Sequence, residues 1–519
     1  MDNYKLAKCC RYLFLPLFSA FVFVFLLVLL ETAFQLNSYL KSENKLNYYY
    51  PSFCCGFKLK KNYSNPPIQI DHRGFRKTPF DYSKVPQSKV YKIVAMGDST
   101  TFGRTNEEFF TYPSYLELIL NSPRMKMKLP DGKSYIDVIN AGIPSYTSDL
   151  LKDYLNNFVL EMDPDMVTIS IGQMDTPDYQ KNSILRSLEK NIPLFYWYVN
   201  ISASFSYLEK VLSPDFSIKN KMGLNDKEKT VQNLLNDEGK AFGSSQYENN
   251  IREIVKILKE RDIIPVLIPW PKVSGKDQVK YFTFDEEEIM DKSEILKYKV
   301  FGQIMEKISK EFNVPFVRTP FQLPIIPKKH NAKYFMTSGS HLNNYGAKIV
   351  GLSLANAISG ILEGKSNDGI FLESFASKPD ADILDRYVYV VSTLETDLKV
   401  RKQKTIETFE KQIADYCLMH TKEDMTIEGY HFSECFFAVA DTAFYQMRQK
   451  HYISSKHYLD YAVNRYPKWS YPFFIYGLYQ FELGNYNEAE SHFKKAVKLA
   501  PFFKTPQNYL ERLQHIEKQ

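Results

Sequence analysis

The sequence lacks features that would indicate several classes of protein. Its 519 residues carry a net charge of only +6, with acidic and basic residues interspersed, so there is no basic stripe of the kind that nucleic-acid binding requires. Neither a P-loop nor a Rossmann glycine motif occurs, and no two cysteines have the C-x-x-C spacing of a zinc site. We therefore expect no nucleic acid, metal or organic cofactor as a partner.

Cysteine is scarce, with six in the whole chain. They form three groups: Cys9 and Cys10, Cys54 and Cys55, Cys417 and Cys435. The first two could be acylated, although unmodified thiols are the simpler interpretation. A bridge between the neighbours Cys54 and Cys55 would be strained. Cys417 and Cys435 could form a disulfide in an oxidising compartment, and the sequence leaves this open.

What is present suits a folded protein of several domains. Hydrophobic residues make up 44% and charged residues 24% of the chain, which is ordinary for globular proteins. The length predicts two or three domains.

A long apolar run occurs near the N-terminus. Leu13–Leu30 is apolar apart from Ser19, which is just long enough for a helix to span a bilayer. Three basic residues precede it, Lys5, Lys8 and Arg11. Because positive residues favour the cytoplasmic side, we predict that residues 1–34 form a cytoplasmic tail and a transmembrane signal-anchor. The main body would then be periplasmic or extracellular. A cleaved signal peptide is the alternative, but no A-x-A-like cleavage site follows.

After an irregular approach segment, residues 35–89, regular patterns begin. Within it, Gln69–Arg76 is expected to be ordered against the next domain. Five short, β-branched apolar runs then predict strands: Tyr91–Met96, Ile136–Asn140, Met166–Ile171, Ile263–Ile268 and Val314–Val317. Helical patterns lie between them: Tyr112–Asn121, Ser148–Glu161, Gln246–Arg261, Ser293–Phe312 and Asn344–Leu362. This alternation predicts an α/β domain over residues 90–364, a three-layer, doubly wound parallel sheet of five strands. Residues 180–245 interrupt the rhythm and are predicted to form a helical insertion.

The C-terminal region, residues 381–519, follows a linker at 365–380 and carries a helical pattern that repeats every 34 residues. Equivalent positions include Tyr452 and Tyr486, Leu459 and Phe493, Ala462 and Ala496, Ala443 and Gly477, Pro467 and Pro501. The pattern resembles tetratricopeptide repeats, which implies a surface that binds a protein partner. One pair of helices buries too little alone, so helices within Ala381–Met419 are expected to complete the stack. A generic helical bundle is the alternative.

The most informative stretch is Tyr91–Gly103, YKIVAMGDSTTFG. It predicts a buried strand that ends at Gly97-Asp98-Ser99, with Ser99 at the carboxyl edge of the sheet and at the start of a helix. A serine nucleophile needs a base to take its proton and donors to hold the developing oxyanion.

Those parts occur in blocks that resemble the SGNH, or GDSL-type, serine hydrolase family over about residues 69–360. The first block, AMGDSTTFG, implies Ser99 as nucleophile, and VINAGIPSYTS implies that the amide of Gly142 joins that of Ser99 in the oxyanion hole. The last block, SGSHLNNYGAKIVG, implies His341 as general base. The flavodoxin-like fold of the family agrees with the predicted sheet.

Two positions depart from the family pattern. The block G-x-N-D is Gly172-Gln173-Met174-Asp175 here, so Met174 replaces an asparagine that would donate to the oxyanion. Gln173 is the neighbouring amide and a candidate substitute. Ser338 replaces the aspartate that usually orients the histidine in D-x-x-H. Both changes predict a weakened site. Asp98 and Asp175 are interpreted as structural residues that hydrogen-bond loop amides.

Three functions are compatible with these residues. The first is a membrane-anchored serine esterase that removes a small acyl group from cell-envelope carbohydrate or lipid, a substrate class implied by the resemblance. The second is an O-acyltransferase to polysaccharide that uses the same residues, Ser99 and His341. The third is a catalytically impaired scaffold that binds partners through its repeats.

Overall fold

The structure, a computed structural model, describes residues 48–175 with short gaps, 244–269, 292–317, 336–364 with short gaps and 434–516, together with a few isolated residues. The chain divides into two compact units, Met1–Lys60 with Pro177–Asn233, and Lys61–Thr176 with Leu234–Gln519. In the first unit, strands β1 (Tyr49–Ser52) and β2 (Gly56–Leu59) form an antiparallel hairpin. Cys55 in its turn is buried and disulfide-bonded.

The second unit is built on a parallel sheet. Its strands are β5 (Val90–Gly97), β6 (Tyr135–Gly142), β7 (Met166–Ser170) and β8 (Ile264–Leu267), in the order β6-β5-β7-β8. Almost every residue of β5 and β7 is buried, as expected for strands covered on both faces. The order is that of the flavodoxin-like, doubly wound sheets, in which the strand order reverses beside the first strand.

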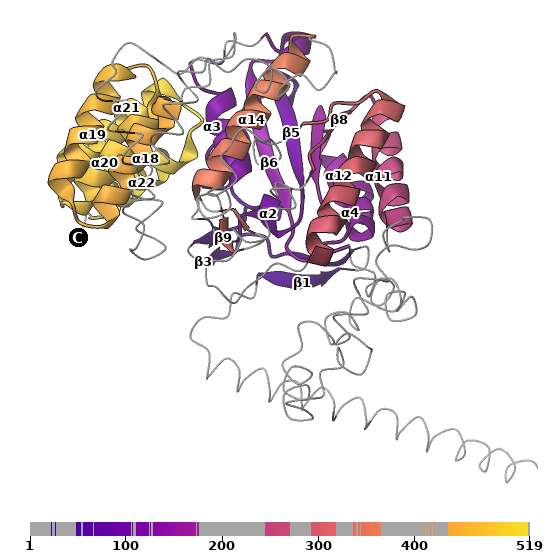
Figure 1. Ribbon diagram of the computed structural model, residues 1–519. Coiled ribbons are helices and arrows are strands. Elements are labelled where there is room, and N and C mark those ends of the chain that lie inside the picture. Colours follow the sequence, from indigo (N-terminus) through magenta and orange to yellow (C-terminus); the bar gives the residue numbers. More distant parts are fainter. Residues whose placement is uncertain are drawn as a thin grey trace, which may run out of the picture. The chain divides into compact units, whose positions relative to one another are not determined.

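Helices cover both faces of this sheet (Figure 1). On one side lie α3 (Tyr112–Leu120) and α14 (Asn344–Leu362), and on the other α4 (Ser148–Tyr154), α11 (Ser244–Lys259) and α12 (Lys292–Phe312). The prediction of an α/β sandwich with these helices is confirmed. The helix expected over Ser148–Glu161 changes after α4 to a π-helical turn, Leu155–Val159, and a 3₁₀ turn, Leu160–Met162.

The prediction of a fifth strand at Val314–Val317 is wrong in extent. Among the described residues the sheet has four strands, and this segment adds only one isolated parallel bridge, between Phe316 and Leu267. The amide of Leu267 donates to Pro315 O at 2.9 Å and that of Val317 donates to Leu267 O at 2.9 Å. Because Pro315 has no amide hydrogen, it cannot extend the ladder as a donor.

The approach segment is ordered as expected at Gln69–Arg76. Antiparallel bridges join Arg76 to Ile70 and to Asn140 of β6. The Arg76 side chain is buried, and its Nη2 donates to Pro67 O at 2.9 Å and to Asn106 O at 3.3 Å. This segment therefore belongs to the α/β domain.

The C-terminal region is helical, as predicted. It contains α18 (Glu434–Arg448), α19 (Tyr452–Arg465), α20 (Ser470–Glu482), α21 (Tyr486–Leu499) and α22 (Lys504–Ile516). Gly477 lets α20 approach α21 closely, because a Cβ there would lie 2.4 Å from the ring of Phe493. The backbone of this region also reaches the approach segment, where Phe503 bridges Phe80.

Several predictions fall on residues outside this description. They are the insertion at 180–245 up to the start of α11, the linker at 365–380, the pair Cys417 and Cys435 as a disulfide, and nearly all of Ala381–Met419. Of Leu13–Leu30 only two isolated residues are described. In the part of the chain that is described, no helix combines the length and the apolar composition needed to cross a membrane.

Candidate active site

Ser99 is positioned by a tight turn at the carboxyl end of β5. Asp98 caps the short helix α2 (Ser99–Phe102), accepting at Oδ1 from the amide of Thr100 at 3.0 Å. Gly103 ends the helix with φ 73°, and its amide donates to Ser99 O at 3.0 Å. Gly97 allows the end of β5 to pack closely against the end of the neighbouring strand β7, since a Cβ on residue 97 would be 2.3 Å from Ser170 O. Ser99 is thereby fixed as the first residue of the helix, 6% exposed.

His341 lies beside Ser99, although it is near the C-terminal end of the domain in the sequence. It begins strand β10 (His341–Leu342), which pairs with β9 (Met336–Ser338) just before α14. Its Nε2 lies 3.0 Å from Ser99 Oγ. This is hydrogen-bonding distance, and with the proton on Nδ1, Nε2 can accept the hydroxyl proton. The two residues named from the sequence as nucleophile and base, 242 positions apart, are thus brought together.

Comparison with protein families agrees with this geometry. Residues 93–354, half of the chain, match the family described as GDSL-like Lipase/Acylhydrolase. The chain belongs to this family. The matched residues contain Ser99, Gly142 and His341, so the earlier resemblance is confirmed at the level of the family.

Solved structures with a similar arrangement include several esterases and lipases. One is a lipase/acylhydrolase from Enterococcus faecalis, with 16% identity, TM-score 0.31, and coverage of 52% of this chain and 96% of that chain. Another is a catalytic mutant of Axe2, an acetylxylan esterase from Geobacillus stearothermophilus, with 17% identity, TM-score 0.30, and coverage of 52% and 94%. A third is a GDSL-like lipase from Bacteroides thetaiotaomicron, with 16% identity, TM-score 0.28, and coverage of 54% and 89%. No curated protein matches the chain.

Gly142, which the GDSL pattern implied as an oxyanion donor, makes two other contacts. Its amide donates to Asn140 Oδ1 at 3.1 Å. A Cβ on it would lie 2.2 Å from the backbone nitrogen of Phe102, so the glycine lets β6 approach α2. The packing alone accounts for a glycine here, and the role of its amide in an oxyanion hole remains a prediction.

The two departures from the GDSL pattern can be placed only in part. Met174 is half-buried in the turn between Gly172 and Asp175, and its thioether cannot donate a hydrogen bond to an oxyanion. Ser338 pairs through its backbone with His341, so it lies next to the histidine. Gln173 lies outside the described residues.

The structural interpretation of the two aspartates is confirmed. Asp98 caps α2, as described above. Asp175 accepts from the amide of Ser148 at 3.1 Å and from its hydroxyl at 2.6 Å, so it caps the start of α4 from a distant loop. Asn250 of α11 donates to the same hydroxyl at 2.8 Å. A carboxylate at a helix N-terminus is favourable, and here it anchors the loop that carries Met174.

Buried tyrosines support the loops of this GDSL site. Tyr112, the first residue of α3, and Thr101 of α2 share a hydrogen bond of 3.0 Å, and burial raises the pKa of Tyr112. Tyr247 of α11 donates to Ile171 O at 3.0 Å, and burial raises its pKa well above the ordinary value. Both phenols therefore stay protonated at neutral pH and hold the loops as neutral groups.

The sequence reasoning missed Ser145, in the loop after β6. Its φ is 69°, and the amide of Tyr146 donates to Ile143 O at 3.3 Å. Pro144 and Ser145 are thus the central residues of a type II turn, which needs a positive φ at its second central position. In the sequence, Pro144 could have indicated this turn, because proline favours the first central position of a type II turn. Strained backbone of this kind gathers at functional sites, and this turn follows the end of the strand beside Ser99.

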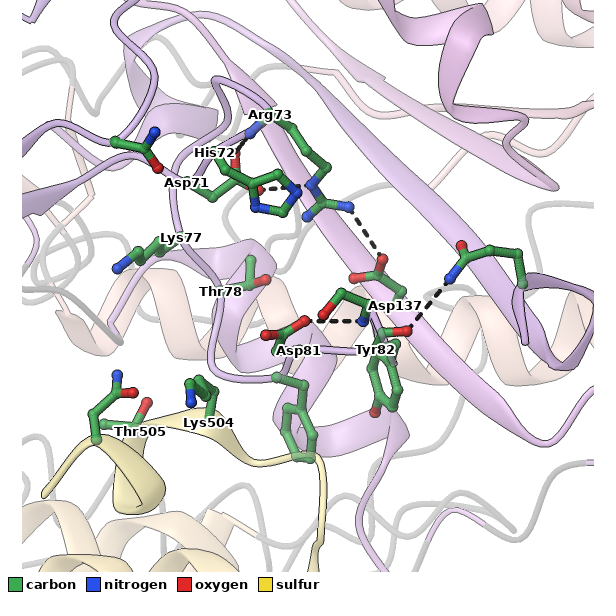
Figure 2. Close-up of a pocket in the computed structure, with 15 residues that line it drawn as sticks. Asp71, His72, Arg73, Lys77, Thr78, Asp81, Tyr82, Asp137, Lys504 and Thr505 are labelled. Atoms are coloured by element: carbon green, nitrogen blue, oxygen red, sulfur yellow. Dashed lines mark hydrogen bonds and ion pairs between the residues drawn. The ribbon is translucent and has the colours of Figure 1, made fainter. Parts of the chain in front are cut away.

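A pocket of about 590 Å³ is lined by residues of the approach segment, by Asp137 of β6 and by residues of α22, among them Lys504 and Thr505 (Figure 2). Asp137, the third residue of β6, lines it, whereas Gly142 ends that strand beside α2. Five residues of strand separate the two by about 16 Å, so the pocket is not the GDSL site. Arg73 lies between Asp71 and Asp137, at 2.7 and 3.5 Å. Burial raises the pKa of Asp137 while Arg73 opposes this.

Within the described segments, no group of three or more His, Cys, Asp and Glu side chains is arranged to hold a metal ion.

Proposed function

We propose that this chain is a serine esterase in which Ser99 is the nucleophile and His341 the general base. The observation that carries the proposal is the 3.0 Å distance between Ser99 Oγ and His341 Nε2 in a member of the GDSL family. It is the contact that activates a serine hydroxyl.

The reaction proceeds in two steps. Ser99 Oγ attacks the acyl carbonyl while His341 Nε2 takes its proton, and the protonated imidazole then gives that proton to the leaving alcohol. Water, deprotonated by His341, attacks the acyl-serine, releases the carboxylic acid and restores the hydroxyl. The amide of Ser99 is the proposed oxyanion donor. The amide of Gly142 joins it when its hydrogen bond to Asn140 Oδ1 is broken.

The test uses the full chain and 4-nitrophenyl acetate or butyrate. Ser99→Ala is expected to lower kcat by about 10⁴-fold or more, and to abolish labelling by a fluorophosphonate. Ser83→Ala, at an exposed serine, is the matched control and should retain both. If the wild-type chain neither hydrolyses these esters nor is labelled, the enzymatic proposal fails and an impaired scaffold becomes the better description.

The substrate proposed is a small acyl ester on cell-envelope carbohydrate or lipid. The apolar run Leu13–Leu30 would hold the enzyme at the membrane, with its body in the periplasm or outside the cell. The disulfide of Cys55 supports an oxidising compartment. Detergent-dependent extraction together with an unprocessed mass would support the anchor, and a mass lacking the first thirty-odd residues would exclude it. Free acid as the sole product, with an oligosaccharide acceptor present, would argue against acyl transfer.

The helices α18–α22 are proposed to be tetratricopeptide-like repeats that bind a protein partner. Two residues 34 positions apart, Ala462 and Ala496, have equivalent environments. Both are fully buried, and the carbonyl of each accepts a hydrogen bond from the backbone amide that ends its helix. Ala462→Leu and Ala496→Leu should therefore lower the free energy of unfolding by similar amounts, about 1–3 kcal/mol. Clearly unequal losses in denaturant unfolding would contradict equivalent repeats.

A further inference from the structure

One asparagine connects the segment that carries His341 with two other parts of the chain. Asn344 is the first residue of α14, three residues after His341. Its Oδ1 accepts from Nδ2 of Asn106 at 3.0 Å, and its own Nδ2 donates to the hydroxyl of Tyr445 at 3.2 Å. Both ends of this side-chain amide are therefore held, one by the loop after α2 and the other by α18 of the C-terminal region.

The loop on the Asn106 side is the one that shapes the turn of Ser99. The amides of Gly103 and Arg104 donate to Ser99 O at 3.0 and 3.2 Å, and the amide of Asn106 donates to Gly103 O at 3.1 Å. Asn106 is 2% exposed. Contacts thus run in a closed ring from Ser99 through α2, Asn106 and Asn344 to His341, whose Nε2 returns to Ser99 Oγ.

On the Tyr445 side of Asn344, α18 contacts the α/β domain at two positions along the helix. Tyr445 and Phe444 contact the buried ring of Phe110, with centroids 6.3 and 5.3 Å away. One helical turn further, Lys348 of α14 meets Asp441 of α18 at 3.2 Å. Since residue 344 pairs with 445 and residue 348 with 441, α14 and α18 are joined by two polar contacts in antiparallel register.

We propose that Asn344 and Tyr445 are positioning residues, through which the C-terminal helices hold His341 at hydrogen-bonding distance from Ser99. This rests on the proposed function of those two residues. The helical region is then part of the hydrolytic apparatus, in addition to any role in binding a partner. A displacement of about 1 Å can cost on the order of 10² in rate, so a hydrogen bond three residues from the base matters.

The experiment compares Tyr445→Phe, Asn344→Ala and the double variant in the full chain. Tyr445→Phe removes only the hydroxyl and should lower kcat by about 10-fold, while KM changes less than 2-fold. Asn344→Ala, which removes the hydrogen bond to Asn106 as well as the one to Tyr445, should lower kcat by about 10²-fold. The double variant should match Asn344→Ala alone, because Tyr445 acts through Asn344. Tyr486→Phe is the control, a tyrosine of the same region that is 37% exposed.

A second measurement does not depend on turnover. In ¹⁵N-histidine NMR, with the His341 signal assigned by its loss in His341→Gln, Tyr445→Phe should shift that signal and Tyr486→Phe should not. An unchanged signal and unchanged kcat in Tyr445→Phe would overturn the positioning role. Multiplicative losses of kcat in the double variant would also overturn it.

Failure of the proposed function has a separate signature. In that case the wild-type chain shows neither Ser99-dependent hydrolysis nor labelling, and the NMR comparison alone decides the positioning role. If Ser99-dependent hydrolysis is present but insensitive to Tyr445→Phe and Asn344→Ala, only the positioning role is lost.

Discussion

Lys348 Nζ lies 3.2 Å from Asp441 Oδ2, and neither side chain has any exposure to solvent. Two phenols complete the environment of the carboxylate: Tyr471 donates to Oδ1 at 2.7 Å and Tyr115 to Oδ2 at 3.3 Å. The four residues come from α14, α18, α20 and α3, so the pair fastens the C-terminal helices to the α/β domain. Burying both charges is costly, and removing one partner leaves the other charge uncompensated.

The first prediction concerns this ion pair. Asp441→Asn keeps an oxygen for one tyrosine but removes the negative charge, so the free energy of unfolding should fall by about 3–5 kcal/mol. Lys348→Met should cost a similar amount. The double variant should be more stable than either single variant, because it has no unpaired buried charge. Denaturant unfolding of the full chain measures all three.

The control is Lys456→Met, which breaks the exposed pair of Lys456 with Asp460. A surface pair of this kind contributes less than about 1 kcal/mol. If the double variant loses the sum of the two single losses, the two buried charges do not compensate one another and the argument is wrong.

Much of the α/β domain was predictable from local patterns. Continuous apolar runs gave four of the strands, because strands covered by helices on both faces need no polar residues. Ser99 and His341 followed from blocks whose chemistry is specific. Helix α14 matches its predicted bounds of Asn344–Leu362.

The contacts between distant elements were not predictable. Lys348 lies in a helix whose sequence gives no sign that one lysine is fully buried, since its partner Asp441 is 93 positions away. Asn344 and Tyr445 have the same difficulty, at 101 positions. Gly142 shows a different limit. The family pattern implied that its amide is an oxyanion donor. The close approach of β6 to α2 is a second reason for a glycine at this position, and only the three-dimensional structure shows it.

The second prediction tests that reason. Gly142→Ala places a Cβ 2.2 Å from the backbone nitrogen of Phe102, so α2 must move and Ser99 with it. The free energy of unfolding should fall by about 3 kcal/mol, and fluorophosphonate labelling of Ser99 should slow. Gly132→Ala is the matched control, because nothing lies within 4 Å of its Cβ and only its φ of 68° is unfavourable. It should cost about 1–2 kcal/mol and leave labelling unchanged, and equal behaviour of the two variants would contradict the packing argument.

The third prediction concerns Met174. Met174 stands at the sequence position where the GDSL pattern has an asparagine, next to Asp175, which anchors the loop to α4. Met174→Asn should supply an oxyanion donor and raise kcat on an aryl ester by between about 10- and 10³-fold. Met174→Leu keeps an apolar side chain without a donor and should leave kcat near the wild-type value. A gain with leucine, or none with asparagine, would show that residue 174 does not face the oxyanion.

The last prediction is a pH dependence of stability that originates in Glu117. This carboxyl is fully buried and accepts from the amides of Val138 and Phe80, at 3.1 and 3.0 Å. Burial, with a further contribution from the charge of Asp137, raises its pKa well above the ordinary 4.5. Between 4.5 and the folded-state pKa, the folded protein holds a proton that the unfolded chain has lost. The free energy of unfolding should therefore fall as pH rises through this window, by up to about 1.4 kcal/mol per pH unit for this group.

Glu117→Gln removes the titration and should flatten that part of the slope. Its amide nitrogen meets a backbone donor, which lowers stability equally at every pH, so slopes rather than absolute values must be compared. Denaturant unfolding at pH 5, 6 and 7 measures them, with Glu482→Gln at an exposed position as control. Parallel slopes for wild type and Glu117→Gln would mean that Glu117 is already ionised in the folded protein at pH 5, and that its two amide donors outweigh its burial.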